Sequence, residues 1–342
     1  MSTRMNTPRG TGRAPVAVAV VTWNSADVLP GLIASLPAGA GDVPYRLVVV
    51  DNASSDDTVT VARRLAPEAT VLQTGRNAGY AAGVNAAIAE THASPAVLVL
   101  NPDVRLLPGC LPTLLAALDE PHTGIAVPRL TDADGALIHS MRRRPTLLRA
   151  YADAVLGATV AGRWPALGEV VTDPVRYEHD ARPDWAEGST QLVSRACLDA
   201  CGPWDESYFL YSEETDFHLR AGSRGLGVRY VPSAGAQHLE GGSGTSPRLW
   251  ALLTANRLRL FSRLSSRPAT ALYWVALMLR ESTRALRGDA IARAAVRTLV
   301  RPSLLRAPRG PAWLDLYDAV DRGATPNPVL PAGEAHAEAS GT

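Results

Sequence analysis

Four short apolar segments, each followed by a turn or a helix-forming stretch, constrain the fold of this chain more than any other feature. They cover residues 15–23, 45–52, 69–74 and 96–101 and are rich in β-branched residues. Continuous apolar runs of this length are typical of strands buried on both faces. Helices are expected over 28–36 and 58–66, and a glycine-rich turn leads into another within 75–92. The alternation predicts an α/β fold with an open, mostly parallel sheet and flanking helices.

Polar residues follow the ends of these strands. Trp23 and Asn24 come after the first, Asp51 ends the second, and residues 101–103 follow the fourth. Open parallel sheets bind ligands beyond the carboxyl ends of their strands, so these residues are expected to converge on a ligand. The Asp51 carboxylate can accept hydrogen bonds from a ribose or a base-ring N–H. The alternative is an aspartate that starts a turn and caps the next helix.

A second polar group lies between Trp204 and His238. It contains Asp205, Glu206, Glu213, Glu214, Asp216 and the closing His238 around a short aromatic segment. Carboxylates among aromatic residues are costly to bury unless a metal, a proton or hydrogen bonds compensate them. Together with Asp103, the group predicts a metal-assisted transfer centre with a separate carboxylate that acts as base.

Composition excludes several other classes of function. None of the 342 residues is lysine, which excludes Schiff-base chemistry and a P-loop nucleotide site. The three cysteines form no CxxC pair, so reduced thiols of a cytoplasmic protein are expected. The polar N-terminus lacks the apolar stretch of a signal peptide, and no run reaches the roughly 18 apolar residues of a spanning helix.

Positive charge is concentrated near the C-terminus. Residues 245–309 contain thirteen arginines against Glu281 and Asp289, although the whole chain carries a net charge of only +1. The apolar stretch 269–279 has arginines on both sides and suits helices that lie on an anionic membrane surface. The alternative is a helical subdomain with solvated arginines. A nucleic acid is not expected as partner, because no recognition motif or aromatic stacking platform accompanies the charge.

The chain is long enough for one large or two modest domains. We expect disordered tails over 1–13 and 323–342, an α/β domain over 14–244, and a basic amphipathic helical region over 245–322.

Several motifs in this order resemble family 2 glycosyltransferases. They are VAVVTWNSADVLPGLIASL, VVVDNASSDDT, GRNAGYAAGVNAAI, VLVLNPDV, the block from GSTQLVSRACLDACGPWDESYF to LYSEETDFHLRA, and VPSAGAQHLEGGSG. The resemblance covers roughly residues 15–245 and is strongest to bacterial rhamnosyltransferase-like members that act on lipid-linked acceptors. It implies the GT-A nucleotide-sugar fold and inverting transfer of a sugar. The resemblance suggests rhamnose as that sugar. The donor would be a dTDP- or UDP-sugar.

The resemblance also implies the setting of the reaction. It predicts a divalent metal, Mn²⁺ or Mg²⁺, and a glycan or polyprenyl-diphosphate-linked acceptor in cell-envelope polysaccharide synthesis. We therefore expect a cytoplasmic protein, peripheral on the inner face of the cell membrane; a homodimer is left open. Two rival hypotheses are a nucleotidyltransferase and a non-catalytic, membrane-associated module that binds nucleotide sugars.

The resemblance assigns the donor and metal contacts of the family to individual residues of this chain. The expected donor-binding residues are Thr22, Asn24, Asp51, Arg76, Asn77, Gly79, Asn101 and Asp103. The missing side chain of Gly79 would let a ligand approach the backbone, and the following helix N-terminus suits a diphosphate.

The family's Asp-x-Asp metal motif reads Asn101-Pro102-Asp103 here, so Asp103 is the expected ligand and Asn101 offers only a neutral oxygen. His238 would be a further ligand by resemblance, and Mn²⁺ tolerates imidazole. The alternatives are a surface turn at 101–103 and a structural histidine.

The base is expected in the segment Glu213-Glu214-Thr215-Asp216. Relatives have Glu-Asp-x-Asp with the first aspartate as base, so Glu214 takes that place, with Glu213 second. Asp216 would orient the loop or hydrogen-bond the acceptor. The alternative is an acidic helix N-terminus stabilised by the macrodipole. For the acceptor and the donor sugar, the expected residues are Trp185, Gly188, Ser189, Trp204 and Asp205.

Overall fold

The computed structural model describes residues 14–239 and 246–321. Its main sheet has eight strands in the order β3-β2-β1-β4-β9-β6-β10-β5. Their bounds are β1 (Val16–Thr22), β2 (Tyr45–Asp51), β3 (Thr70–Gln73), β4 (Ala96–Leu100), β5 (Val104–Leu106), β6 (Thr123–Thr131), β9 (Thr190–Ser194) and β10 (Gly227–His238). The first four strands pair in parallel, as do β6 and β10, whereas β9 and β5 run antiparallel to their neighbours. The α/β fold with a mostly parallel sheet is confirmed.

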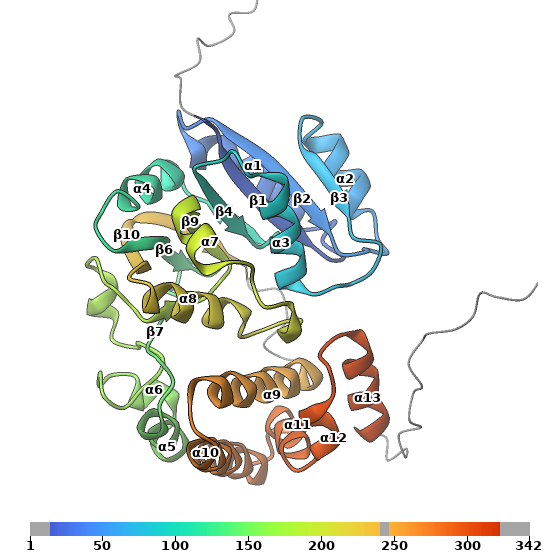
Figure 1. Ribbon diagram of the computed structural model, residues 1–342, viewed down its shortest axis with the longest axis vertical. Helices are drawn as coiled ribbons and strands as arrows, with labels where there is room; N and C mark the ends of the chain where they lie inside the picture. Colours follow the sequence, from blue (N-terminus) through green and yellow to red (C-terminus); the bar gives the residue numbers. More distant parts are fainter. Residues whose placement is uncertain (1–13, 240–245, 322–342) are drawn as a thin grey trace, which may run out of the picture.

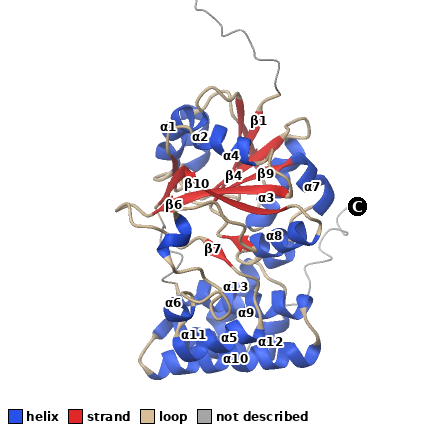
Figure 2. Cartoon of the chain, turned by 90° about the vertical axis from the view of Figure 1, so that its left-hand side faces the viewer, coloured by secondary structure: helices blue, strands red, loops and turns tan. Residues whose placement is uncertain are grey.

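Helices cover both faces of the sheet and also form a layer beside it. On the sheet lie α1 (Leu29–Ala40), α2 (Thr58–Leu65), α3 (Tyr80–Glu90), α4 (Cys110–Ala117), α7 (Arg195–Cys201) and α8 (Glu213–Ser223). The layer below, at the foot of Figures 1 and 2, holds α5 (Leu147–Leu156), α6 (Ala158–Ala161), α9 (Pro247–Leu264), α10 (Arg267–Leu286), α11 (Ala290–Leu299), α12 (Pro302–Arg306) and α13 (Pro311–Asp321).

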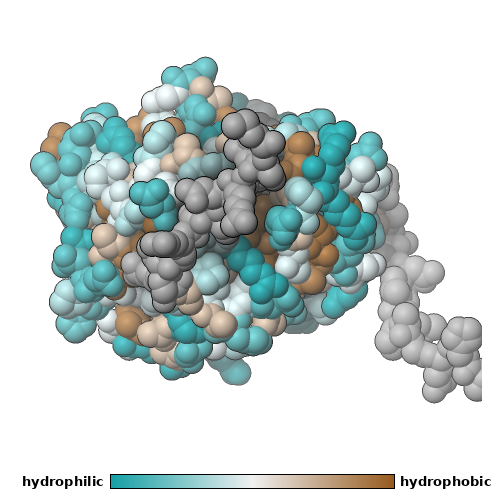
Figure 3. Space-filling view, turned by 90° about the horizontal axis from the view of Figure 1, so that it is seen from above, coloured by the Kyte–Doolittle hydropathy of each residue, from teal (hydrophilic) through white to brown (hydrophobic). Residues whose placement is uncertain are grey.

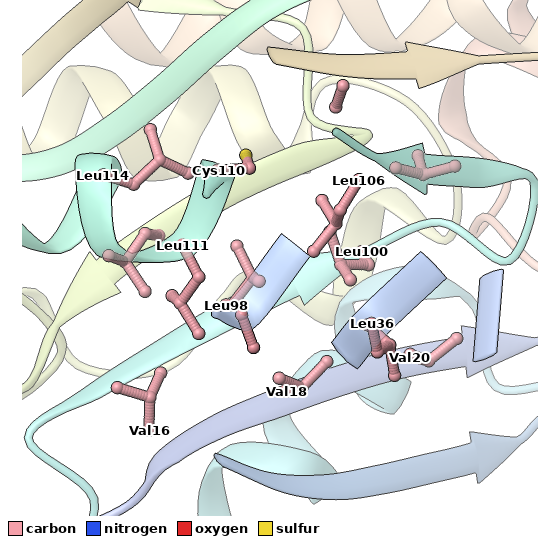
Figure 4. Packing of buried hydrophobic residues seen from close by; sticks show 14 of the residues in the cluster. Val16, Val18, Val20, Leu36, Leu98, Leu100, Leu106, Cys110, Leu111 and Leu114 are labelled. Carbon is pink, nitrogen blue, oxygen red and sulfur yellow. The ribbon is translucent and has the colours of Figure 1, made fainter. Parts of the chain in front are cut away.

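The sheet is buried on both faces, which explains its unbroken apolar strands. Val16, Val18 and Val20 of β1 pack with β4 and beneath α1 and α4, as Figure 4 shows. The alternate residues of β1, among them Ala17 and Ala19, pack on the other face against α3, α7 and α8. Both faces of β1 pack against helices. Apolar runs in the sequence were therefore sufficient to predict where the strands and helices lie.

The helical layer combines two distant parts of the sequence. α5 packs on α10, where the Tyr151 hydroxyl donates to the carbonyl oxygen of Leu272 at 3.1 Å. α9 also packs on α10, where Phe261 stacks on Tyr273 with ring centroids 4.0 Å apart. The layer therefore draws on residues from both sides of the boundary predicted at 244/245. That boundary, and the predicted tails over 1–13 and 323–342, lie outside the described residues.

A short two-stranded sheet, β7 (Met141–Arg142) with β8 (Trp185–Ala186), connects the main sheet to this layer. In the described part of the chain, no helix has the length and apolar character needed to cross a bilayer. On the face of the molecule seen in Figure 3, small apolar groups lie scattered among polar residues.

Candidate active site

Four strand ends meet at one edge of the main sheet. The carboxyl ends of β1 and β4 lie beside the amino end of β9, where Leu100 faces Thr190. The carboxyl end of β10 lies there too, with His238 opposite Val104 of β5. The segments that continue from these strands, residues 101–103 and 187–189, are therefore brought to His238.

A cavity of about 450 Å³, here named the first cavity, opens at this edge. Its polar lining consists of Asn24, Ser25, Asn101, Asp103, Glu187, Ser189, Tyr211, Glu213, Glu214 and His238. Gly188 also lines it. Asp103 and Glu214, which are far apart in the sequence, share one cavity, as a single transfer centre requires.

Asp103, His238 and Glu187 lie in a row in this cavity. The His238 Nε2 is 3.4 Å from the Asp103 Oδ1, and its Nδ1 is 3.8 Å from the Glu187 Oε1. Two ligand atoms of one octahedral ion lie about 3 Å apart when its bonds are about 2.1 Å long. The Asp103 carboxylate and the Nε2 of His238 therefore fit one divalent ion. Glu187 lies near the other ring nitrogen, beyond hydrogen-bond distance, and its carboxylate accepts from the N–H and hydroxyl of Ser189.

Within residues 14–239 and 246–321, no set of three or more His, Cys, Asp and Glu side chains is placed to hold an ion by itself. One carboxylate and one imidazole suit an ion whose remaining ligands are substrate phosphate oxygens and water.

Glu213 and Glu214 begin α8 and both face the first cavity. Glu213 is only 2% exposed; burial raises its pKa well above the usual value, and the charge of Glu214 adds to the shift. Burial also raises the pKa of Glu214 to about 7. Glu187 adds to this shift, while backbone N–H groups and Arg142 oppose it. A carboxyl group with a pKa near neutrality suits a general base at pH 7.

The loop before these glutamates is strained. Phe209, Tyr211 and Ser212 all have φ values between +67° and +75°, a region that residues other than glycine seldom occupy. Each such residue costs of order 1–3 kcal/mol and persists only where its surroundings impose it. Something outside the loop must therefore hold it in place.

Asn256 of α9 holds this loop in its strained conformation. It is fully buried, and its Nδ2 donates to the carbonyl oxygens of Tyr208, Leu210 and Tyr211 at 2.9, 2.9 and 3.1 Å. Its own Oδ1 accepts from the Nε of Arg309 at 3.0 Å. The C-terminal helices thus fix the backbone that places Glu213 and Glu214.

At two positions, a side chain in place of glycine would crowd neighbouring atoms. A Cβ at Gly188 would lie 3.1 Å from both the Cβ and the Cγ of Glu214, so glycine leaves room for the glutamate. A Cβ at Gly79, where φ is +94°, would lie 2.4 Å from the carbonyl oxygen of Phe209. The absence of a side chain at Gly79 therefore allows the backbone of the strained loop to approach closely.

A second cavity, of about 290 Å³, adjoins the first and shares Glu187 and Glu214 with it. It lies between the β7–β8 pair and helices α5, α9 and α10. Its charged and aromatic lining consists of Arg142, Asp153, Glu169, Trp185, Glu187, Glu214, Trp250, Arg257, Tyr273 and Arg280. Trp185 thus lies on this side of Glu214, with its ring beneath the Arg142 guanidinium at 5.7 Å.

A third cavity, of about 670 Å³, adjoins the first on the β1 side and shares Trp23 and Tyr80 with it. Thr22, Asn77 and Gly79 line it, as do Asn52 and Arg248. Asp51 lies behind Thr22 and is 1% exposed. Its Oδ1 accepts from the Thr22 hydroxyl and the Ser54 hydroxyl, and its Oδ2 accepts from the Ser54 N–H. Asp51 therefore organises the turn after β2 in this structure.

Besides Asp51, four predicted residues line none of these three cavities. Arg76 is exposed. Trp204 is 2% exposed and stacks on Phe217 with ring centroids 4.9 Å apart, so it belongs to the core. Asp216 binds the Arg220 Nε at 2.7 Å. Although burial opposes ionisation, hydrogen bonds from Ser207 and Arg263 hold the pKa of Asp205 at about 2.

Sequence reasoning missed Glu187 and Asn256. Glu187 lies inside the segment 185–189, where its neighbours Trp185, Gly188 and Ser189 were predicted, and a carboxylate among them was the available signal. Asn256 had no such signal, because its role depends on contacts with backbone more than 40 residues away.

Solved structures with the same fold are glycosyltransferases. A mannosyltransferase from Pyrobaculum calidifontis, in complex with GDP-Man and Mn²⁺, gives a TM-score of 0.53 at 17% identity over 91% of this chain and 87% of that one. GalNAc-T7 with UDP, GalNAc and Mn²⁺ gives a TM-score of 0.54 at 14% identity over 92% of this chain and 58% of that one.

Sequence relatives point to one family. Residues 17–167 match the model for glycosyl transferase family 2. The N-acetylglucosaminyl-diphospho-decaprenol L-rhamnosyltransferase of Mycobacterium tuberculosis is 35% identical over 234 residues, 65% of this chain and 75% of that protein. A rhamnosyltransferase of Escherichia coli is 24% identical over 65% of this chain and 83% of its own length. The chain belongs to glycosyltransferase family 2 and is a GT-A glycosyltransferase.

Proposed function

We propose that this enzyme transfers rhamnose from a nucleoside diphosphate donor, with inversion, to a sugar hydroxyl of a lipid-linked N-acetylglucosaminyl diphosphate in cell-envelope glycan synthesis. The observation that carries the proposal is the position of Glu214, which lines both the first and the second cavity. Rhamnose as the transferred sugar is suggested by the rhamnosyltransferases that are 35% and 24% identical to this chain, and the lipid-linked acceptor by the first of them.

In this mechanism the donor occupies the first and third cavities. Its nucleoside lies in the third cavity among Thr22, Asn52 and Asn77, and its diphosphate extends past Asn24 to Asp103. Asp103 and His238 would hold a divalent ion, which would offset negative charge on the departing diphosphate. Glu187 keeps the His238 ring oriented.

Glu214 faces the acceptor from the other side. Its carboxylate accepts the proton of the acceptor hydroxyl, and the oxygen forms a bond to the anomeric carbon as the bond to the diphosphate breaks. The electron pair of the broken bond leaves with the nucleoside diphosphate. Glu213 remains protonated beside Glu214, because burial and its neighbour's charge raise its pKa.

The reaction is tested by incubating the protein with a panel of nucleotide rhamnoses and other nucleotide sugars, Mn²⁺ or Mg²⁺, and a short-chain N-acetylglucosaminyl diphosphate lipid. We expect metal-dependent formation of a disaccharide lipid and release of a nucleoside diphosphate. Release of inorganic diphosphate would instead indicate a nucleotidyltransferase. No turnover with any donor would contradict the proposal.

Contact with an anionic membrane forms part of the proposal. Leu272, Val275, Leu279 and Leu286 form an exposed stripe along α10, and Leu148, Val155 and Leu156 form another on α5, which packs beside it. Exposed arginines accompany these stripes at positions 163, 267 and 287. Each arginine near an anionic surface contributes about 1 kcal/mol, and the apolar side chains add to this on insertion.

Membrane contact is tested by sedimentation with vesicles. Binding to vesicles that contain phosphatidylglycerol, with weaker binding to phosphatidylcholine vesicles, is expected. The double variant Val155→Asp with Leu279→Asp should reduce it. Equal binding of the variant and the wild type would show that these stripes do not meet the membrane.

A further inference from the structure

The second cavity contains a buried carboxylate oxygen to which no described residue donates a hydrogen bond. Asp153 of α5 lines the cavity and is 4% exposed, and its Oδ1 has no hydrogen-bond partner among the described residues. An unsatisfied buried acceptor of this kind costs about 1–3 kcal/mol, and more when charged. A ligand that donates a hydrogen bond in this cavity would remove that cost.

Arg142 offers the complementary group. It donates to the backbone carbonyl oxygens of His139 and Met141 and lies over the ring of Trp185, and it takes part in no ion pair with a described residue. The other two arginines of the cavity are engaged: Arg257 binds Glu169 at 2.8 Å, and Arg280 binds Glu281 at 2.7 Å. Arg142 is thus positioned to donate to an oxygen of a ligand.

The charge of the lining decides what kind of ligand fits. Among the described residues that line it, three are arginines and four are acids, namely Asp153, Glu169, Glu187 and Glu214. A bare diphosphate would meet as much negative as positive charge there, which gives it little net attraction. A neutral ring with several hydroxyl groups can donate to the carboxylates and accept from the guanidinium group. An apolar part of the lining is formed by the rings of Trp185, Trp250 and Tyr273, and aromatic linings are common in small-molecule sites.

We propose that the second cavity holds the sugar ring of the acceptor, with one hydroxyl donating to the Oδ1 of Asp153 and a substituent oxygen accepting from Arg142. The reacting hydroxyl then faces Glu214, which lines the same cavity. The diphosphate and lipid of the acceptor lie outside this cavity. This assignment rests on the proposed function, because it takes the acceptor to be a lipid-linked sugar.

The test compares kinetics of wild-type protein, Asp153→Asn and Ala158→Phe, each as the full chain. Ala158 is half-buried and lines the cavity, so a phenyl ring there fills space without removing a polar group. We expect the acceptor KM, relative to the donor KM, to rise roughly 10- to 100-fold in Asp153→Asn. A rise in the same direction is expected in Ala158→Phe. Asp199→Asn, an exposed aspartate on α7 outside both cavities, is the matched control and should behave as wild type.

Two competitors then identify the part of the acceptor that binds here. Free N-acetylglucosamine represents the ring, and an alkyl diphosphate without sugar represents the remainder. The inhibition constant of the free sugar should rise in Asp153→Asn while that of the alkyl diphosphate stays the same. If only the alkyl diphosphate is affected, the cavity holds the diphosphate and the assignment is overturned.

The failures of the two proposals can be told apart. A wild-type enzyme that transfers sugar, together with folded Asp153→Asn and Ala158→Phe variants whose acceptor KM is unchanged, would overturn the ring site alone. A wild-type enzyme without transfer activity would overturn the proposed function. If Asp153→Asn fails to fold, Ala158→Phe decides the question.

Discussion

The two cavities that meet at Glu214 are built in different ways. The first is formed mainly by short segments next to the ends of β1, β4, β9 and β10, whose positions follow from the register of the sheet; its glutamates at the start of α8 depend instead on the strained loop. The second is formed by side chains from the β7–β8 pair, α5, α9 and α10, which come together only when the helical layer packs. In the proposed mechanism, the sheet edge thus places the donor-side residues and the helical layer places the acceptor-side residues.

The strongest test of this difference between the two cavities is a substitution of Glu214, the residue that lines both. Glu214→Gln keeps the size of the side chain but removes the base, so kcat should fall by roughly 10²- to 10⁴-fold. Glu213→Gln, which removes a carboxyl group that is already protonated, should lower kcat much less. Steady-state transfer assays measure both variants. A larger loss in Glu213→Gln would move the role of base to position 213.

The donor side is tested through Glu187. Glu187→Gln removes the carboxylate near the Nδ1 of His238, and loss of such a partner typically weakens metal binding 10- to 100-fold. The Mn²⁺ concentration that gives half-maximal activity should rise by about that factor. An unchanged Mn²⁺ requirement, with activity retained, would remove Glu187 from the ion site.

The sequence revealed the first cavity better than the second. Apolar runs located β1, β2 and β4 because those strands are buried on both faces, and strand ends then placed Asn24 and Asp103 at a shared edge. The position of Asp153 depends on how α5 packs on α10, and that of Arg142 on the pairing of β7 with β8; no local pattern encodes either. Trp204 was misleading, because an aromatic residue next to an acid is equally typical of a core stack such as that with Phe217.

The link between the helical layer and the sheet is tested through Asn256. Asn256→Leu removes three hydrogen bonds to the strained loop, which should lower the free energy of unfolding by about 3 kcal/mol. It should also lower kcat, because these hydrogen bonds no longer fix the backbone that positions Glu214. Denaturant unfolding and steady-state kinetics measure the two effects.

The matched control for that variant is Asn85→Leu. Asn85 exchanges hydrogen bonds with the backbone of Trp204 and lies outside both cavities. This variant should lose stability while kcat stays within a few-fold of wild type. If both variants lower kcat equally at equal stability, Asn256 has no particular role in positioning Glu214.

The smallest expected effect is on stability as a function of pH. The pKa of Glu213 is raised above its unfolded value of about 4.5, so the stability it contributes is present at low pH and is lost as pH rises through the folded pKa. Glutamine stays neutral at every pH. The Tm of Glu213→Gln relative to wild type should therefore increase from pH 5 to pH 9, by roughly 2 °C or more. A difference that shrinks over this range would contradict the raised pKa.

The most direct test of the central claim, that Glu214 takes the acceptor's proton between the two cavities, is the pH dependence of kcat. In the wild type, kcat should fall below a pKa of about 7, because burial keeps the carboxyl group protonated at lower pH. In Glu214→Gln the small remaining rate should show no such acid limb. An acid limb near pH 7 that persists in Glu214→Gln would contradict the account.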